Sequence, residues 1–195
     1  MHSRYSHDSS TSLPELVERA RELGFNRIAL TDHNTAEGAL ELAAREPGLC
    51  IPGEEVKTTE GEVIGLYVTR TIRPWRRPEE VMDEIHEMGG IVYIAHPFDR
   101  WRASFRPERI VALAGRIDVI ETYNQWADSR ANTQAADLAR ELGKAGASGS
   151  DAHAIAELGH SWNAVEPFSS APELVDVLAR GVQHRSEVSG TQRRA

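Results

Sequence analysis

Apolar side chains recur along this chain with two spacings, one typical of amphipathic helices and the other of buried strands. Residues 13–23 place apolar side chains on one helical face, behind a capping box formed by Ser12 and Glu15. Short apolar runs such as 91–95 are instead typical of buried strands. We expect helices near 13–23, 35–45, 78–88, 107–114, 131–142 and 172–178, and strands near 27–31, 49–52, 62–68, 91–95, 117–122, 145–149 and 164–165.

The predicted strands and helices alternate with short connections. This order is typical of a parallel sheet with crossover helices, and no internal repeat interrupts it. We therefore expect a single α/β domain over residues 1–183. Residues 184–195 are polar and rich in arginine at the end, and we expect them to form a disordered tail.

Composition narrows the class of protein further. With 195 residues, 40% of them hydrophobic and 27% charged, the chain suits one folded domain and excludes a coiled coil, a collagen-like repeat and a mainly disordered protein. No apolar run reaches the roughly 18–20 residues of a membrane span, and the first ten residues lack the apolar segment of a secretory signal. Cys50 is the single cysteine, so no intramolecular disulfide can form, and we expect a cytoplasmic protein without a membrane partner.

The net charge of −8 bears on the partners of the chain. A field of this sign repels nucleic acid, so we expect no binding to duplex nucleic acid. An anionic substrate would need positive charge near its own binding site.

Histidines and acids follow five of the predicted strands, and this is the strongest chemical signal in the sequence. In a parallel α/β barrel the carboxyl ends of all strands meet at one face, so these side chains would share one site. Mixed histidine and carboxylate ligands suit Zn²⁺, Mn²⁺ and Fe²⁺, and one carboxylate can bridge two ions about 3.5–4 Å apart. The residues at these strand ends are Asp32 with His33, Glu54 with Glu55, His96, Asn124, and Asp151 with His153.

Each of these residues alone has a simpler interpretation. Asp32 could cap the following helix or orient His33, and a single histidine after a strand is more often structural than a ligand. His86 lies among acids in a predicted helix and His184 lies in the predicted tail, so we expect both on solvated surfaces. The prediction of a metal site therefore rests on the joint pattern.

These motifs resemble the PHP family, named for polymerase and histidinol phosphatase. The segment from His2 to Asp8 is similar to the leading signature of the family from its second histidine onward. The other resembling segments, in chain order, are Thr31-Asp-His-Asn34, Gly53-Glu-Glu-Val56, Ala95-His-Pro97 and Gly149-Ser-Asp-Ala-His153. The resemblance runs from residue 2 to about residue 180.

The resemblance implies a distorted (β/α)7 TIM-like barrel that holds two to three divalent ions of Mn, Zn or Fe, with Mg as a further candidate. It implies a phosphoesterase that uses water activated by these ions, with Glu55, Asp151 and His153 as the catalytic residues. The implied ligands are His2, Glu55 and Asp151 for the first ion, Glu55, His96 and a residue near Asn124 for the second, and Asp8, His33 and His153 for the third.

The sequence departs from the family pattern at two places. It begins at Met1, where the family has the residue between its two leading histidines, so we expect the first strand and the first ligand to be absent. A start codon assigned too late is the simplest explanation. The second departure is Asn124, which is a weaker ligand than the histidine of the family.

Arginines close to a strand end suggest a phosphorylated substrate. Arg100 and Arg102 follow His96, and a guanidinium group matches the oxygens of a phosphate. Four further arginines between residues 70 and 77 suit a solvated loop equally well. We expect the substrate to be a small phosphate ester or a nucleotide.

Two other functions remain open at this point. One is an amidohydrolase-type metal hydrolase, against which Glu55 and the pair Asp151 and His153 argue. The other is a metal-binding regulatory module with impaired catalysis, which the missing first histidine would explain.

Overall fold

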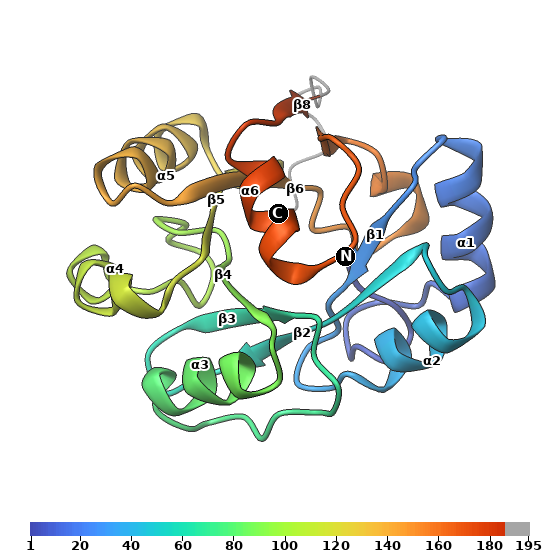
Figure 1. Ribbon diagram of the computed structural model, residues 1–195, viewed down its shortest axis with the longest axis horizontal. Helices are drawn as coiled ribbons and strands as arrows, with labels where there is room; N and C mark the ends of the chain where they lie inside the picture. The colour runs from blue at the N-terminus through green and yellow to red at the C-terminus, as the bar shows by residue number, and fades with distance from the viewer. Residues whose placement is uncertain (186–195) are drawn as a thin grey trace.

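A curled six-stranded sheet organises the fold in the computed structural model, which describes residues 1–185 (Figure 1). The strands follow one another in the order β1-β2-β3-β4-β5-β6, and β7 and β8 form a separate hairpin. The helices are α1 (Leu13–Glu22), α2 (Glu37–Arg45), α3 (Pro78–Glu87), α4 (Pro107–Leu113), α5 (Ser129–Glu141) and α6 (Ala171–Leu178), with short 3-10 turns at Ala114–Arg116 and Ile155–Glu157. The strands are β1 (Ile28–Leu30), β2 (Cys50–Lys57), β3 (Glu62–Leu66), β4 (Ile91–Ile94), β5 (Val119–Asn124), β6 (Ala145–Gly149), β7 (Ser161–Ala164) and β8 (Val182–Arg185).

The helices cover the two faces of the curled sheet unequally. Figure 1 shows α1 to α5 arranged around the outside of the sheet, with α6 near its middle. Apolar residues of α6, such as Leu174, pack against Ile91, Val119 and Ala145, which begin β4, β5 and β6. The inner helix therefore lies at the amino ends of the parallel strands, and their carboxyl ends are left for the site.

The helix boundaries follow the capping signals in the sequence. The side chain of Ser12 accepts from the backbone N–H of Glu15, and the Glu15 carboxylate accepts from Ser12 N at 2.8 Å, so the predicted capping box is present. Pro78 and Pro107 occupy the first turn of α3 and α4, where a missing N–H costs no helical hydrogen bond.

The sheet is not parallel throughout, which corrects the expectation from the β-α alternation. Strand β3 runs antiparallel to both β2 and β4, whereas the pairs β1–β2, β4–β5 and β5–β6 are parallel. The physical reason is the connection: Thr58 to Gly61 form a tight turn closed by the hydrogen bond from Thr58 N to Gly61 O, too short for a crossover helix. As a result, the first residue of β3 lies beside the carboxyl end of β2.

In the described residues the sheet has six strands and forms only part of a barrel. The seven strands expected of a (β/α)7 barrel are therefore not established. Residues 1 and 2 lie between the ends of β1 and β6, because Thr31 N donates to Met1 O and His2 N donates to Ala152 O. Over residues 1–185 no further strand joins β1 to β6.

The hairpin of β7 and β8 includes two residues that the sequence prediction assigned to the tail. His184 is exposed, as expected, and its ring stacks on that of Trp162 with ring centroids 4.8 Å apart. The remainder of the predicted tail, residues 186–195, lies outside the described residues. Within residues 1–185 no helix is long and apolar enough to cross a membrane.

Candidate metal centre

The innermost group of metal-ligand side chains joins the start of the chain to β2 and to the loop after β6. His2 Nε2 lies 3.1 Å from Asp151 Oδ1 and 3.4 Å from Glu55 Oε2. His2 is 1% exposed and Glu55 is 2% exposed, so both side chains are withdrawn from water. These three residues, which we name the Asp151 cluster, place one donor atom each within 4.8 Å of one another.

A second group lies next to the first and includes the predicted ligands Asp8, His33 and His153. Asp8 Oδ2 is 3.1 Å from His153 Nε2 and 3.4 Å from His33 Nε2. The hydroxyl of Ser6 donates to Asp8 Oδ1 at 2.9 Å and accepts from His33 N at 3.2 Å, so Ser6 ties the two residues to each other. We name these three residues the Asp8 cluster; the His2 ring stacks on the rings of His33 and His153.

His96 joins the centre through Glu55. Its Nε2 lies 3.2 Å from Glu55 Oε1, and the ring is 4% exposed. Burial favours the neutral form of His96, but the hydrogen bond to Glu55 and the charge of Glu55 outweigh it and raise the pKa of His96 to about 9. Burial likewise opposes ionisation of Glu55, but the same hydrogen bond and the charges of His96 and His2 lower the pKa of Glu55 to about 2.

The two acids of the Glu54–Glu55 pair face opposite sides of β2, because successive side chains alternate along a strand. Both residues lie inside β2 and not after it, since β2 extends to Lys57. Glu54 accepts a hydrogen bond from Ile72 N at 2.8 Å, and burial raises its pKa to about 8. Glu54 therefore belongs to the packing outside the sheet and not to the centre.

Asp32 performs neither of the roles that the sequence suggested. Its carboxylate accepts hydrogen bonds from the backbone N–H and the hydroxyl of Ser3, the latter at 2.8 Å, and it is fully buried. Helix α2 has no side-chain cap. Asp32 thus anchors the segment that carries His2. The sequence around residues 31–34 contains no sign of this contact, because Ser3 lies far away along the chain.

Of the two predicted phosphate-binding arginines, Arg102 contacts residues of the centre, whereas Arg100 is exposed. The guanidinium group of Arg102 contacts the Asp151 carboxylate and donates to Asn124 Oδ1 at 3.2 Å. Arg100 is exposed on the same loop. Asn124 itself is buried, and its amide group donates to Glu121 Oε2 at 3.0 Å.

Two acids of the centre were missed in the sequence. Glu62 joins His33 and Glu55 in a third group, which we name the Glu62 cluster. Glu121 accepts from His96 N at 2.7 Å and from the Tyr93 hydroxyl at 3.1 Å, and burial raises its pKa. The signal for Glu121 was an acid directly after the apolar pair Val119 and Ile120 of a predicted strand, whereas Glu62 required knowledge of the strand direction.

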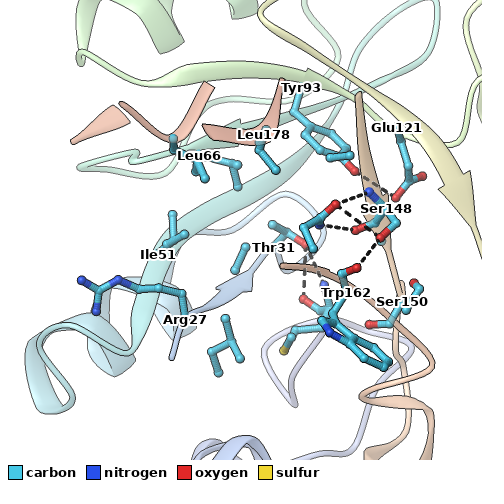
Figure 2. A pocket seen from close by; sticks show the side chains of 18 of the residues that line it. Arg27, Thr31, Ile51, Leu66, Tyr93, Glu121, Ser148, Ser150, Trp162 and Leu178 are labelled. Atoms are coloured by element: carbon cyan, nitrogen blue, oxygen red, sulfur yellow. Dashed lines mark hydrogen bonds between the residues drawn. The ribbon is translucent and has the colours of Figure 1, made fainter. Parts of the chain in front are cut away.

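A cavity of about 820 Å³ lies along the inner face of the sheet beside these clusters. Glu55, His96 and Asp151 form part of its wall, and apolar side chains such as Ile51 and Leu66 form another part. Figure 2 shows Glu121 and Tyr93 at one side of the cavity and Arg27 at the other. A small molecule could therefore contact the clusters and an apolar wall together.

The donor set fits divalent metal ions. Imidazole nitrogens and carboxylate oxygens are the ligands of Mn²⁺, Fe²⁺ and Zn²⁺ sites, and every residue of the three clusters offers one such atom. Several acids crowd here, and Glu55 raises the pKa of Glu62 in addition to the larger effect of burial. A bound cation would relieve this repulsion.

A curled α/β sheet with such clusters at one edge is the combination of fold and site that metal-dependent hydrolases use. The chain belongs to the PHP family: residues 1–61 match the PHP domain and residues 129–182 match the PHP-associated region. This confirms the resemblance drawn from the sequence motifs.

Two proteins of Methanocaldococcus jannaschii are similar in sequence. MJ1587 is 35% identical over 122 residues, which cover 61% of this chain and 70% of that protein. MJ0417 is 33% identical over 139 residues, which cover 69% of this chain and 55% of that protein. The matched part is thus little more than half the length of MJ0417.

Solved structures share the fold at low sequence identity. A candidate metal-dependent phosphoesterase from Bifidobacterium adolescentis gives a TM-score of 0.67 at 16% identity, over 93% of this chain and 94% of that chain. PsfC from Pseudomonas syringae gives a TM-score of 0.68 at 18% identity, over 89% of this chain and 82% of that chain. An amidohydrolase from Chromobacterium violaceum gives a TM-score of 0.68 at 19% identity, over 93% of this chain and 95% of that chain. At these identities the likeness concerns the fold.

Proposed function

We propose that this protein is a metal-dependent phosphoesterase that hydrolyses a small phosphate ester or a nucleotide. The observation that carries the proposal is the position of Glu55. Its two carboxylate oxygens lie 3.2 Å from His96 Nε2 and 3.4 Å from His2 Nε2, so one acid faces two separate histidines. A carboxylate in this position is suited to hold two cations side by side.

The residues that would hold the ions are those of the clusters. Asp8, His33 and His153 would bind one ion, His2, Glu55 and Asp151 a second, and Glu55 with His96 a third. When bound, divalent ions lower the pKa of a water molecule towards 7 and polarise a phosphoryl oxygen. We propose two to three ions of Mn, Zn or Fe, with Mg as a further candidate.

Residues behind the ligands keep the donor atoms in place. Glu121 accepts from His96 N, and Asp32 holds Ser3 beside His2. A Cβ at position 149 would lie 2.0 Å from Glu121 Oε1, so glycine at this position leaves room for Glu121. Such partners hold the ligands in one geometry before substrate arrives.

Arg102 is suited to bind the phosphate of the substrate. Its guanidinium group already contacts a carboxylate, that of Asp151, within the centre. Guanidinium forks bind phosphate oxygens with the same geometry. The amidohydrolase from Chromobacterium violaceum was solved with bound sulfate, a tetrahedral anion similar in shape to phosphate.

The reaction class is tested by comparing substrates on one protein sample. With Mn²⁺ present, we expect turnover of generic phosphate monoesters or diesters and none of amide or cyclic imide substrates. The Glu55→Gln variant should lose this turnover because the acid shared by two ion sites becomes neutral. Turnover of amides alone would favour the amidohydrolase-type alternative. Metal binding without any hydrolysis would favour the regulatory module.

Arg102 and Arg100 form a matched pair for testing phosphate recognition. Hydrogen bonds to charged groups contribute about 1.5–3 kcal/mol, so Arg102→Gln should raise the KM for the phosphate ester roughly tenfold or more. Arg100→Gln should change KM less than about twofold. Arg100 is exposed, and an ion pair formed in water contributes little binding energy. Equal KM changes in the two variants would contradict the role of Arg102.

A further inference from the structure

We propose that Glu62 is a ligand of the ion held by Glu55 and His96, in the place that the family resemblance gives to Asn124. The inference rests on the proposed metal centre and adds a ligand to it. Its basis is the direction in which the side chains of Asn124 and Glu62 point.

The amide group of Asn124 is oriented as a donor towards the centre. Asn124 Nδ2 donates to Glu121 Oε2 at 3.0 Å and lies 3.4 Å from Asp151 Oδ2. Its oxygen accepts from Trp126 N at 2.9 Å and from Arg102 at 3.2 Å. The backbone N–H of Trp126 can only donate, so it fixes which amide atom is the oxygen. The oxygen that would bind a cation is therefore already shared between two donors.

Glu62 presents a carboxylate where Asn124 presents none. Its Oε2 lies 3.9 Å from His96 Nε2, and the residue belongs to the cluster with His33 and Glu55 whose donor atoms lie within 4.8 Å of one another. The side chain is 13% exposed. An ion between Glu55 and His96 would thus find a third donor in Glu62.

The antiparallel pairing of β2 and β3 explains this position. Lys57 pairs with Glu62 and Glu55 pairs with Ile64, so these four side chains share one face of the two-stranded segment. Glu55 and Glu62 are diagonal neighbours on that face, within reach of each other's side chains. The hydrogen bond from Glu62 N to Ala103 O, 2.9 Å, fixes the start of β3 against the loop that follows His96.

Lys57 gives Glu62 a partner in the absence of a cation. Its Nζ lies 3.5 Å from Glu62 Oε1, and the ammonium group is partly exposed. A cation at Glu62 and the ammonium group of Lys57 would compete for the same carboxylate. Removing the ammonium group should therefore strengthen metal binding.

The test is a calorimetric titration of Mn²⁺ into protein stripped with EDTA and dialysed. Compared with the unmodified protein, Glu62→Gln should lose one bound ion per chain or bind it at least about tenfold more weakly. Lys57→Met should bind it several-fold more tightly, and Asn124→Ala should keep the number of bound ions. Glu60→Gln is the matched control, because Glu60 lies two residues before Glu62, in the turn that precedes β3, and pairs with Arg109 outside the centre. It should bind as the unmodified protein does.

The outcomes separate this inference from the proposed function. If the unmodified protein binds no Mn²⁺, both are overturned. If it binds Mn²⁺ and Glu62→Gln binds the same number of ions with the same affinity, only the role of Glu62 is overturned. Loss of a bound ion in Asn124→Ala, together with unchanged Mn²⁺ affinity in Lys57→Met, would also overturn the role of Glu62. If Glu62→Gln proves unstable in EDTA, these two variants decide the question.

Discussion

Alanine at His153 or at His33 is expected to reduce hydrolysis by at least about 100-fold, because each substitution removes a nitrogen that faces Asp8. Even the outer partners of metal ligands typically cost roughly 10–100-fold when they are lost. The measurement is the initial rate of phosphate ester hydrolysis at saturating Mn²⁺, with the metal content of each variant determined in parallel. We expect the loss of rate to accompany a loss of bound metal.

His86→Ala is the matched control for these variants. His86 is half-exposed on α3, and its Nε2 lies 2.9 Å from Asp118 Oδ2. Neither residue belongs to the three clusters. Its removal should leave the rate within a few-fold. His184 is a poorer control, because it stacks on Trp162, which lines the cavity. Equal losses of rate at His86 and His153 would show that the assignment of the strand-end residues is wrong.

Mn²⁺ is expected to stabilise the folded protein strongly, and EDTA to remove that stabilisation. Binding to the folded state alone contributes about 2.7 kcal/mol at a ligand concentration 100 times Kd, which corresponds to a rise in melting temperature of roughly 5–10 °C for a chain of this size. The physical source is the relief of repulsion among the acids of the centre, such as Glu55 and Asp151. Thermal unfolding followed by circular dichroism measures the shift.

Glu55→Gln is the informative comparison for the thermal shift. It removes the charge that faces both His2 and His96 and keeps the size of the side chain. Most of the Mn²⁺-dependent rise in melting temperature should disappear in this variant. A rise of equal size in both proteins would place the stabilising ion elsewhere in the molecule.

Local signals in the sequence predicted most of the elements and much of the site. The run 145–149 coincides with β6, and the capping box at Ser12 begins α1 where expected. His33 and His96 could be found from sequence because a ligand directly after a strand needs no knowledge of distant contacts. Whether they bind metal stays a prediction for the experiments above.

The parts that were missed depend on which segments meet in space. The antiparallel direction of β3 follows from the tight turn after Lys57, and only that direction brings Glu62 to the carboxyl end of β2. The partner of Asp32 is Ser3, about thirty positions earlier in the chain. A pattern read within a window of ten residues contains no information on either contact.

The ring of His33 lies between two of the clusters, with Nε2 3.4 Å from Asp8 Oδ2 and Nδ1 4.0 Å from Glu55 Oε2. A neutral imidazole has one lone pair and one N–H, so it can serve as a ligand on one side only. A cation bound beside Asp8 would take the lone pair of Nε2, and the N–H would then lie on Nδ1, on the side of the Glu55 carboxylate. A cation at Asp8 would fix this tautomer and thereby the hydrogen on the side of Glu55. The two candidate ion sites would therefore be linked through a single proton, and filling one of them would change the affinity of the other.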